Sequence, residues 1–201
     1  MKVTRAQATA NRERVIETAS QLFREKGFNG IGLNELMQAA GLTRGGFYGQ
    51  FDSKQDLAVH ASHTALSDTL QRWENIAAQA SPDTLEQLTR FYLSDEHHHN
   101  PAQGCAFAAL GSDVARQHSP ELHQVFSDGM EAFLQVLQQC VTGNTPQQKR
   151  QQAMATLATL VGALILSRTV KDPILSAELR KAATSQILHR YEEDKSAINR
   201  I

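Results

Sequence analysis

A chain of 201 residues with 41% hydrophobic content can form one large domain, or a small domain joined to a larger one. Its composition excludes a disordered, collagen-like or disulfide-scaffolded protein, since only Cys105 and Cys140 could pair. The net charge of −1 is unevenly spread, because residues 1–51 hold seven Lys or Arg against four Asp or Glu. This local positive excess has the sign that contact with phosphates requires.

The first residues, Met1-Lys2-Val3-Thr4-Arg5, lack the apolar region of a secretory signal. The longest apolar run, Leu157 to Leu166, falls short of the roughly 18 residues that a membrane span needs. We therefore expect a soluble, cytoplasmic protein.

Apolar residues recur at helical spacing along the chain, and no alternating run predicts a strand. Thr4 and Gln7 have the spacing of a capping box, which begins a first helix that Gly27 ends. A short second helix over residues 33–40 stops at Gly41. A third is predicted from residue 43, where Thr43 is a suitable N-cap, through residue 51.

The segment Ser53-Lys54-Gln55-Asp56 forms another capping box and begins a long helix that we expect to end near Ala80. Good turn sequences separate five further helices. These lie near residues 83–96, 104–117, 120–141, 146–170 and 174–192. The fold predicted is all-α with about nine helices. A three-helix helix-turn-helix domain would occupy residues 1–52, and a larger helical bundle would occupy residues 53–201.

The helices on either side of Gly41-Leu42 match a helix-turn-helix, whose second helix enters the DNA major groove. Residues 43–51 include three glycines, each costing about 1 kcal/mol relative to Ala inside a helix. A helix whose backbone must approach DNA closely has a reason to carry them. Phe47 and Phe51 should face the core, leaving Tyr48 to reach a phosphate. A three-helix packing unit without DNA contact is the alternative, and it leaves the glycines unexplained.

Several residues match one family in order and spacing. They are Gly27-Phe28, Leu36 to Ala40, Gly41-Leu42-Thr43, Phe47-Tyr48, Phe51, Ser53-Lys54 and Leu57. Over this first quarter, the chain resembles the TetR family of transcriptional regulators. The resemblance implies a second domain that binds a small molecule and forms a homodimer through its last two long helices.

Position by position, the resemblance implies that Thr43, Tyr48 and Lys54 contact phosphates and that Arg44 and Gln50 reach bases. Arg can pair bidentately with guanine and Gln with adenine. Gly45 and Gly46 complete the predicted DNA-binding set. Two alternatives stay open, namely that Arg44 contacts only phosphate and that Gln50 is solvated. No contact is assigned to Ile31-Gly32, because the family often has Thr or Ser there.

Pockets in helical bundles are lined mainly by apolar and aromatic side chains. The predicted ligand-binding residues are Trp73, Tyr92, Cys105, Phe107, Phe126 and Met130. Plain core packing is the alternative for each of them. Cys105 follows Gly104 near a predicted helix start, where the helix dipole favours a thiolate. A repressor that senses oxidants or electrophiles through Cys105 is therefore an alternative hypothesis, as is a small buried residue without reactivity.

The run His97-His98-His99 suggests a metal site, but adjacent histidines rarely face one ion, and a solvated loop is the preferred interpretation. No metal and no cofactor are predicted. Residues 146–192 carry apolar faces, and Gly162-Ala163 allows close approach of a partner helix. A two-fold dimer would require a palindromic operator.

The function predicted is a sequence-specific DNA-binding regulator, a homodimeric repressor released from its operator by a small-molecule inducer. A shift of the long helix after Ser53 would link ligand binding to DNA release. A transcriptional activator is an alternative within the same class. An enzyme is not predicted, because the sequence has neither GxSxG nor a phosphate-binding glycine loop.

Overall fold

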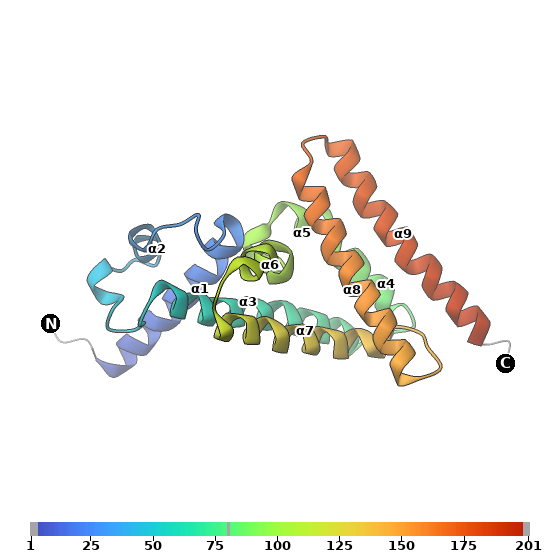
Figure 1. Ribbon diagram of the computed structural model, residues 1–201, viewed down its shortest axis with the longest axis horizontal. Coiled ribbons are helices and arrows are strands. Elements are labelled where there is room, and N and C mark those ends of the chain that lie inside the picture. The colour runs from blue at the N-terminus through green and yellow to red at the C-terminus, as the bar shows by residue number, and fades with distance from the viewer. Residues whose placement is uncertain (1–3, 80, 199–201) are drawn as a thin grey trace. The chain divides into compact units, whose positions relative to one another are not determined.

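The computed structural model describes residues 4–79 and 81–198, and all regular structure in these ranges is helical. The elements appear in Figure 1. In chain order they are α1 (Arg5–Lys26), α2 (Leu33–Ala39), η1 (Arg44–Gly46), α3 (Lys54–Ala77), α4 (Thr84–Tyr92), α5 (Asp95–His99), η2 (Pro101–Gln103), α6 (Ala106–Arg116), α7 (Pro120–Cys140), α8 (Pro146–Thr169) and α9 (Pro173–Ile198). The all-α prediction is confirmed.

The chain forms two compact units. The first combines Met1–Asp68 with Pro101–Gly129, and the second combines Thr69–Asn100 with Met130–Ile201. The long helices α3 and α7 therefore contribute to both units. The predicted boundary between residues 52 and 53 divides the chain by function and remains a prediction.

Local capping chemistry sets the ends of the first helices. The Thr4 hydroxyl accepts a hydrogen bond from the Gln7 amide at 3.2 Å, so α1 begins where its sequence predicts. Gly27 ends α1 with φ 76°, and Gly41 follows α2 with φ 70°. Both angles lie in the left-handed region that glycine adopts without a Cβ penalty.

The helix predicted over residues 43–51 is wrong in its extent. Only η1 forms, followed by turns. The backbone bonds are mostly three residues apart, from Gly46 N to Thr43 O at 3.0 Å and from Phe47 N to Arg44 O at 3.1 Å. The Thr43 side chain occupies the N-cap position but makes no capping bond. Three glycines in nine residues disfavour a regular α-helix, which explains the tighter and shorter turn.

The helix predicted over residues 83–96 is divided. The helix α4 ends at Tyr92, and α5 begins anew because the Ser94 hydroxyl accepts from the His97 amide at 3.1 Å. The helix α3 ends at Ala77, and its predicted end at Ala80 lies outside the described residues.

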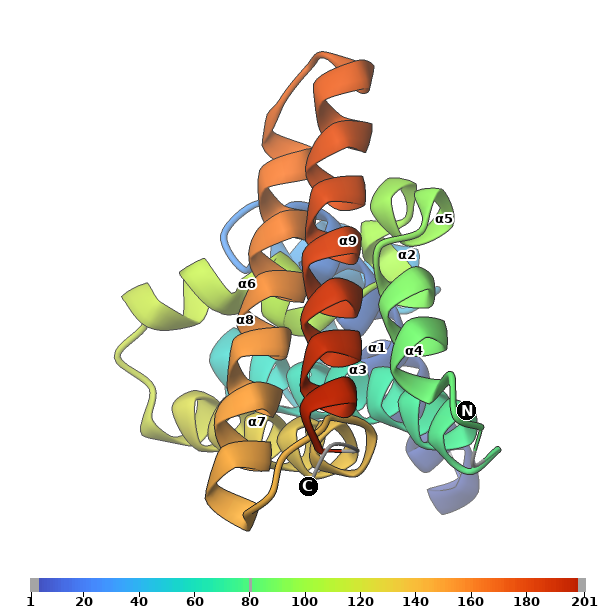
Figure 2. The same ribbon diagram turned by 90° about the vertical axis from the view of Figure 1, so that its right-hand side faces the viewer.

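The second unit is built around a buried aromatic cluster and a pair of long helices. Trp73 packs edge-on against Tyr92 and Phe133, with ring centroids 5.7 Å and 4.9 Å apart. The helices α8 and α9 lie side by side, orange and red in Figures 1 and 2. Among the described residues, α8 alone has the length and composition of a membrane span, and Leu157, Leu160 and Leu164 on one of its faces are buried within the unit.

Candidate nucleic-acid interface

Two buried phenylalanines anchor the segment after Gly41, and several of its other residues are exposed. Phe47 and Phe51 are buried and stacked, with ring centroids 5.4 Å apart. Thr43 and Arg44 are exposed, and Tyr48 is 63% exposed. The predicted split between core-facing and outward-facing residues is therefore confirmed for the two phenylalanines and Tyr48.

No contact or backbone angle within the described part of the protein requires glycine at the three glycine positions of this segment. A Cβ placed on Gly45 or Gly46 would meet nothing within 4 Å, and neither has a positive φ. A Cβ on Gly49 would only reach the Gly46 carbonyl at 4.0 Å. Neither packing nor backbone strain in the protein therefore selects glycine here. Close approach of a partner molecule to this backbone would favour glycine at these positions.

Gln50 differs from the simple solvated side chain that was one of its two interpretations. Its amide oxygen is buried and accepts no hydrogen bond in the described part of the chain. A buried polar atom of this kind costs free energy unless a partner is supplied. This geometry leaves Gln50 with an unused acceptor beside the exposed segment.

Lys54, the first residue of α3, joins that helix to the segment before α2. Its Nζ donates to the Ile31 carbonyl at 2.6 Å, and burial lowers the pKa of the ammonium. An ammonium group has three donors, so this bond leaves others for a phosphate. The lysine therefore places positive charge next to Gly32, the N-cap of α2.

Two residues that sequence reasoning missed fasten α1 to the rest of the first unit. Arg24 is only 4% exposed and donates to the Gly104 carbonyl at 2.9 Å. Asp113 of α6 accepts from the Phe28 amide at 3.0 Å and from Arg116 at 2.7 Å. Arg24 continues a buried face that also contains Ser20, and a charged residue on such a face was the available signal.

The predicted ligand-binding residues are divided equally between the two units. Trp73, Tyr92 and Met130 lie in the second unit, whereas Cys105, Phe107 and Phe126 lie in the first. Phe107 and Phe126 pack edge-on with centroids 5.6 Å apart. In the second unit, Trp73 Nε1 and the Thr89 hydroxyl are buried without a hydrogen-bond partner among the described residues.

The two cysteines occupy different settings. Cys105 is fully buried at the N-cap of α6, in the position its sequence predicted relative to that helix. The Cys140 thiol donates to the Val136 carbonyl at 3.3 Å, and burial raises its pKa to about 11. Both cysteines are reduced.

The interpretation of His97 to His99 as a solvated loop is wrong, because all three belong to α5. His97 Nδ1 bonds to the Tyr92 carbonyl at 2.7 Å and His98 Nδ1 to the Ser167 hydroxyl at 3.1 Å. Arg168 donates to the carbonyls of His97 and His98. In the described ranges, no three His, Cys, Asp or Glu side chains are grouped as metal ligands.

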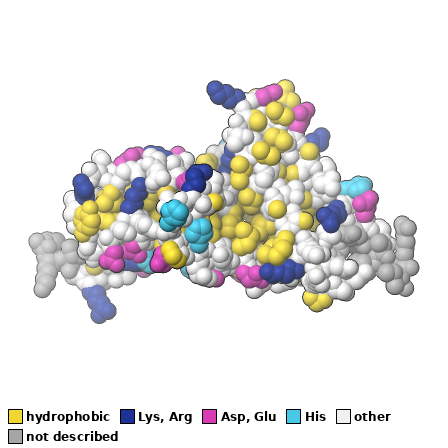
Figure 3. Space-filling view, viewed as in Figure 1, with side chains coloured by type: hydrophobic (Ala, Val, Ile, Leu, Met, Phe, Trp, Pro, Cys, Tyr) yellow, Lys and Arg dark blue, Asp and Glu magenta, His cyan; other side chains and the backbone are white. Residues whose placement is uncertain are grey.

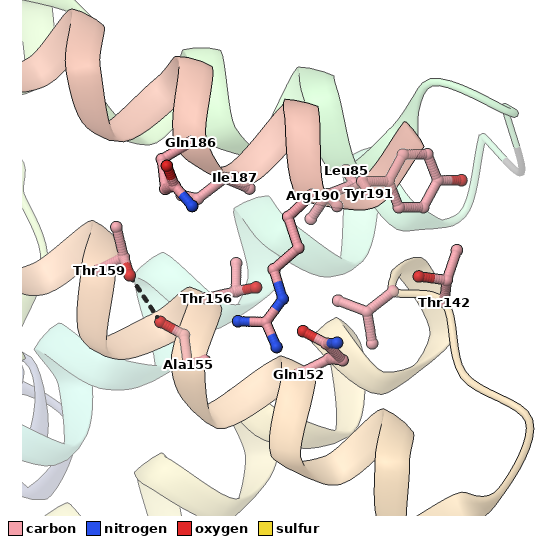
Figure 4. A pocket seen from close by; sticks show the side chains of 11 residues that line it. Leu85, Thr142, Gln152, Ala155, Thr156, Thr159, Gln186, Ile187, Arg190 and Tyr191 are labelled. Carbon is pink, nitrogen blue, oxygen red and sulfur yellow. Dashed lines mark hydrogen bonds between the residues drawn. The ribbon is translucent and has the colours of Figure 1, made fainter. Parts of the chain in front are cut away.

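A small polar cavity lies between α8 and α9 in the second unit (Figure 4). The Arg190 side chain extends from α9 toward Gln152 and Thr156 of α8. At about 50 Å³ the cavity is well below the roughly 300 Å³ of a typical ligand pocket. None of the predicted ligand-binding residues lines it.

Comparisons with known proteins agree on one family. Residues 15–61 match the model of the bacterial regulatory proteins of the tetR family. An HTH-type transcriptional regulator of Lactococcus lactis is 26% identical over 172 residues, 80% of this chain and 85% of that protein. The HTH-type transcriptional repressor NemR of Escherichia coli K12 is 25% identical over 133 residues, 65% of this chain and 66% of that protein.

Solved structures share the fold. The reduced form of Escherichia coli NemR has a TM-score of 0.75 at 22% identity, covering 89% of this chain and 95% of that one. A TetR-family regulator from Cytophaga hutchinsonii also has a TM-score of 0.75, at 19% identity over 94% of this chain and 98% of that one.

Proposed function

We propose that this chain, a member of the TetR family of DNA-binding transcriptional regulators, is a repressor that a small-molecule inducer releases from a palindromic operator. The observation that carries the proposal is the exposed segment after Gly41. Its glycines serve no internal packing, and two buried phenylalanines hold it in place. A backbone that carries no side chains at these positions, and that is anchored by buried phenylalanines, can approach a DNA groove closely.

Within this interface, Thr43, Tyr48 and Lys54 would position the protein on phosphates. Arg44 would contact a guanine or a phosphate, and the free Gln50 oxygen would accept from an adenine amino group. Gly45 and Gly46 would admit the sugar-phosphate backbone. The short turn of η1 supports a footprint concentrated at the start of the segment.

Dimerisation through α8 and α9 is supported by apolar side chains that the second unit leaves exposed. Leu166 is 54% exposed and Ile174 is 69% exposed, and Met154, Ile165 and Leu175 are also exposed. Figure 3 shows hydrophobic side chains gathered over these two helices. A second copy of the chain would cover them, and the resulting two-fold axis would require two matching half-sites.

An inducer site in the second unit is supported by the unpartnered Trp73 Nε1 and Thr89 hydroxyl. Buried polar atoms normally find a partner, and Trp73, which carries one of these two atoms, is a predicted ligand-binding residue that packs against a second one, Tyr92. A ligand offering a hydrogen-bond acceptor to the indole would satisfy this need. The inducer would favour a conformation in which the two DNA-binding segments no longer match their half-sites.

Sensing through Cys105 is a second candidate, favoured by its position at the N-cap of α6. Its complete burial means that an oxidant would reach it only after local opening. An unchanged oxidant response in a Cys105→Ser variant would exclude this candidate.

The first test is to select genomic DNA fragments with the purified protein and to sequence those retained. Enrichment of one palindromic site is expected. Sequence-indifferent binding that weakens with salt would instead indicate a nonspecific DNA-binding module.

A pair of glycine variants tests the interface itself. Gly46→Ala should leave the fold intact or slightly more stable, because nothing obstructs the methyl group, yet it should weaken operator binding at least tenfold. Gly111→Ala in α6 is the matched control, also with open space around its Cβ, and should leave operator affinity unchanged. Equal affinities for wild type and Gly46→Ala would contradict the close approach.

A further inference from the structure

A second cavity, of about 200 Å³, lies in the first unit between the end of α1 and the start of α3. Phe23, Phe28 and Leu122 give it apolar walls, and Asn29 and Gln117 add side-chain amides. Lys54 also lines it. The cavity therefore combines an apolar body with one cation and neutral hydrogen-bonding groups.

Lys54 has no anionic partner in this cavity. Its Nζ bonds to the Ile31 carbonyl and lies 6.0 Å from the centre of the Phe23 ring. The ion pairs of the described residues do not include it, whereas Lys26, the last residue of α1, pairs with Glu35 at 2.6 Å. Burial without a counter-ion lowers the pKa of Lys54, so an anion reaching the ammonium would gain an attraction that solvent screens only in part.

The size of the cavity limits what would fit. An apolar cavity of about 150 Å³ is enough for benzene, so the space here suits a single aromatic ring or a short alkyl chain. The charge of Lys54 selects an anionic group on that body. A carboxylate fits best, because the amides of Asn29 and Gln117 can donate to its second oxygen.

We propose that this cavity binds a small aromatic or short aliphatic carboxylate, with the carboxylate against Lys54 Nζ and the apolar body against Phe23 and Phe28. The consequence for DNA rests on the function proposed above, in which the same ammonium contacts a phosphate. A bound carboxylate competes for that charge and lowers operator affinity. By linkage, operator DNA lowers the affinity for the carboxylate by the same factor.

The test measures, by isothermal titration calorimetry, the binding of benzoate and of its neutral analogue benzamide to the 201-residue chain without DNA. Benzoate should bind saturably and more tightly than benzamide. Lys54→Met, which keeps most of the side-chain stem, should weaken benzoate binding about tenfold or more and leave benzamide binding unchanged. Lys26→Met is the matched control and should bind both probes as the wild type does.

A rim variant keeps the test decisive if Lys54→Met unfolds. Gln117 lies at the non-helical C-cap of α6, so Gln117→Trp should fold and should block both probes. Absence of saturable benzoate binding, equal binding of benzoate and benzamide, or equal losses in Lys54→Met and Lys26→Met would each overturn the site.

DNA competition is measured separately, by repeating the operator titration with saturating benzoate. Reduced operator affinity is expected, and unchanged affinity would overturn the competition at Lys54. Because the probe titration needs no DNA, failure of the repressor function would show only as the absence of an operator.

Discussion

Replacing Arg24 with methionine should destabilise the first unit by about 2–4 kcal/mol. Arg24 is 4% exposed, and its guanidinium donates to the Ser20 carbonyl at 3.0 Å, the Ser20 hydroxyl at 3.2 Å and the Gly104 carbonyl at 2.9 Å. The two Ser20 bonds are local to α1, whereas the Gly104 bond joins α1 to the segment before α6. A hydrogen bond from a charged group contributes about 1.5–3 kcal/mol, and the Gly104 carbonyl would be left buried and unsatisfied. Relief of the buried charge offsets part of this loss.

The free energy of unfolding is measured by urea titration with circular dichroism as the signal, and Tm is measured by thermal unfolding. The expected loss corresponds to a decrease in Tm of roughly 5–15 °C for a chain of this length. Arg116→Met is the matched control, since Arg116 pairs with Asp113 at the surface and an exposed pair contributes about 1 kcal/mol or less. A loss below about 1 kcal/mol in Arg24→Met would refute the reasoning, because it would mean that the Gly104 contact adds no net stability.

Three further predictions follow from single residues. Because burial raises the pKa of the Cys140 thiol to about 11, its rate of alkylation by iodoacetamide should still rise with pH beyond pH 9. The rate is measured by peptide mass spectrometry, and an alkylation rate that reaches a plateau below pH 9 would contradict the raised pKa. Hydrogen bonding and attraction from Arg180 lower the pKa of Asp95, so the pair's stabilisation is complete above the usual carboxyl pKa and is lost as pH falls through the lowered value. The difference in Tm between wild type and Asp95→Asn should therefore be constant near neutral pH and should shrink as pH falls below about 4; a difference that stays constant into acid would contradict the ion pair. Gly41→Ala should cost about 1–2 kcal/mol in urea unfolding because φ is 70°, whereas Gly111→Ala, inside α6 with open space and no positive φ, should cost nothing.

Features decided by neighbouring residues were predictable from the sequence. The cap at Thr4 and the stops at Gly27 and Gly41 depend on a hydroxyl beside a free amide, or on a residue that tolerates positive φ. The burial of Phe47 and Phe51 follows from their spacing of four residues. These local rules set the helix ends of the first quarter of the chain, whereas its family was indicated by the resemblance in residue order and spacing.

Conflicts between local preferences explain the errors. Periodicity favoured a helix over residues 43–51, but three glycines reduce helix stability by about 1 kcal/mol each, and a short turn resulted. Apolar residues at helical spacing also continue through Leu93. The next residue, Ser94, is an N-cap, so a new helix begins there instead of the first one continuing. In both places the signal was present in the residue types, and periodicity outweighed it in the prediction.

Contacts between distant residues could not be predicted from one sequence. Arg24 meets Gly104 across 80 positions, and Phe28 meets Asp113 across 85. The cavity at Lys54 likewise requires residues from α1, α3 and α7 to converge. Nothing in the spacing of these residues indicates their pairing, because each contact depends on how whole helices pack.

The same distant contacts tie the segment around α6 to the end of α1 within the first unit. The segment around α6 holds the end of α1 at two points, where Gly104 before the helix accepts from Arg24 and Asp113 within it accepts from Phe28. A Cβ on Gly27 would lie 2.8 Å from an Asp113 oxygen, so the Asp113 carboxylate lies directly against the Gly27 backbone. Any displacement of α6 must therefore move the end of α1 or break these bonds. Since α1 also packs against α2, such a displacement would shift the exposed segment after Gly41 without any change in the segment's own sequence.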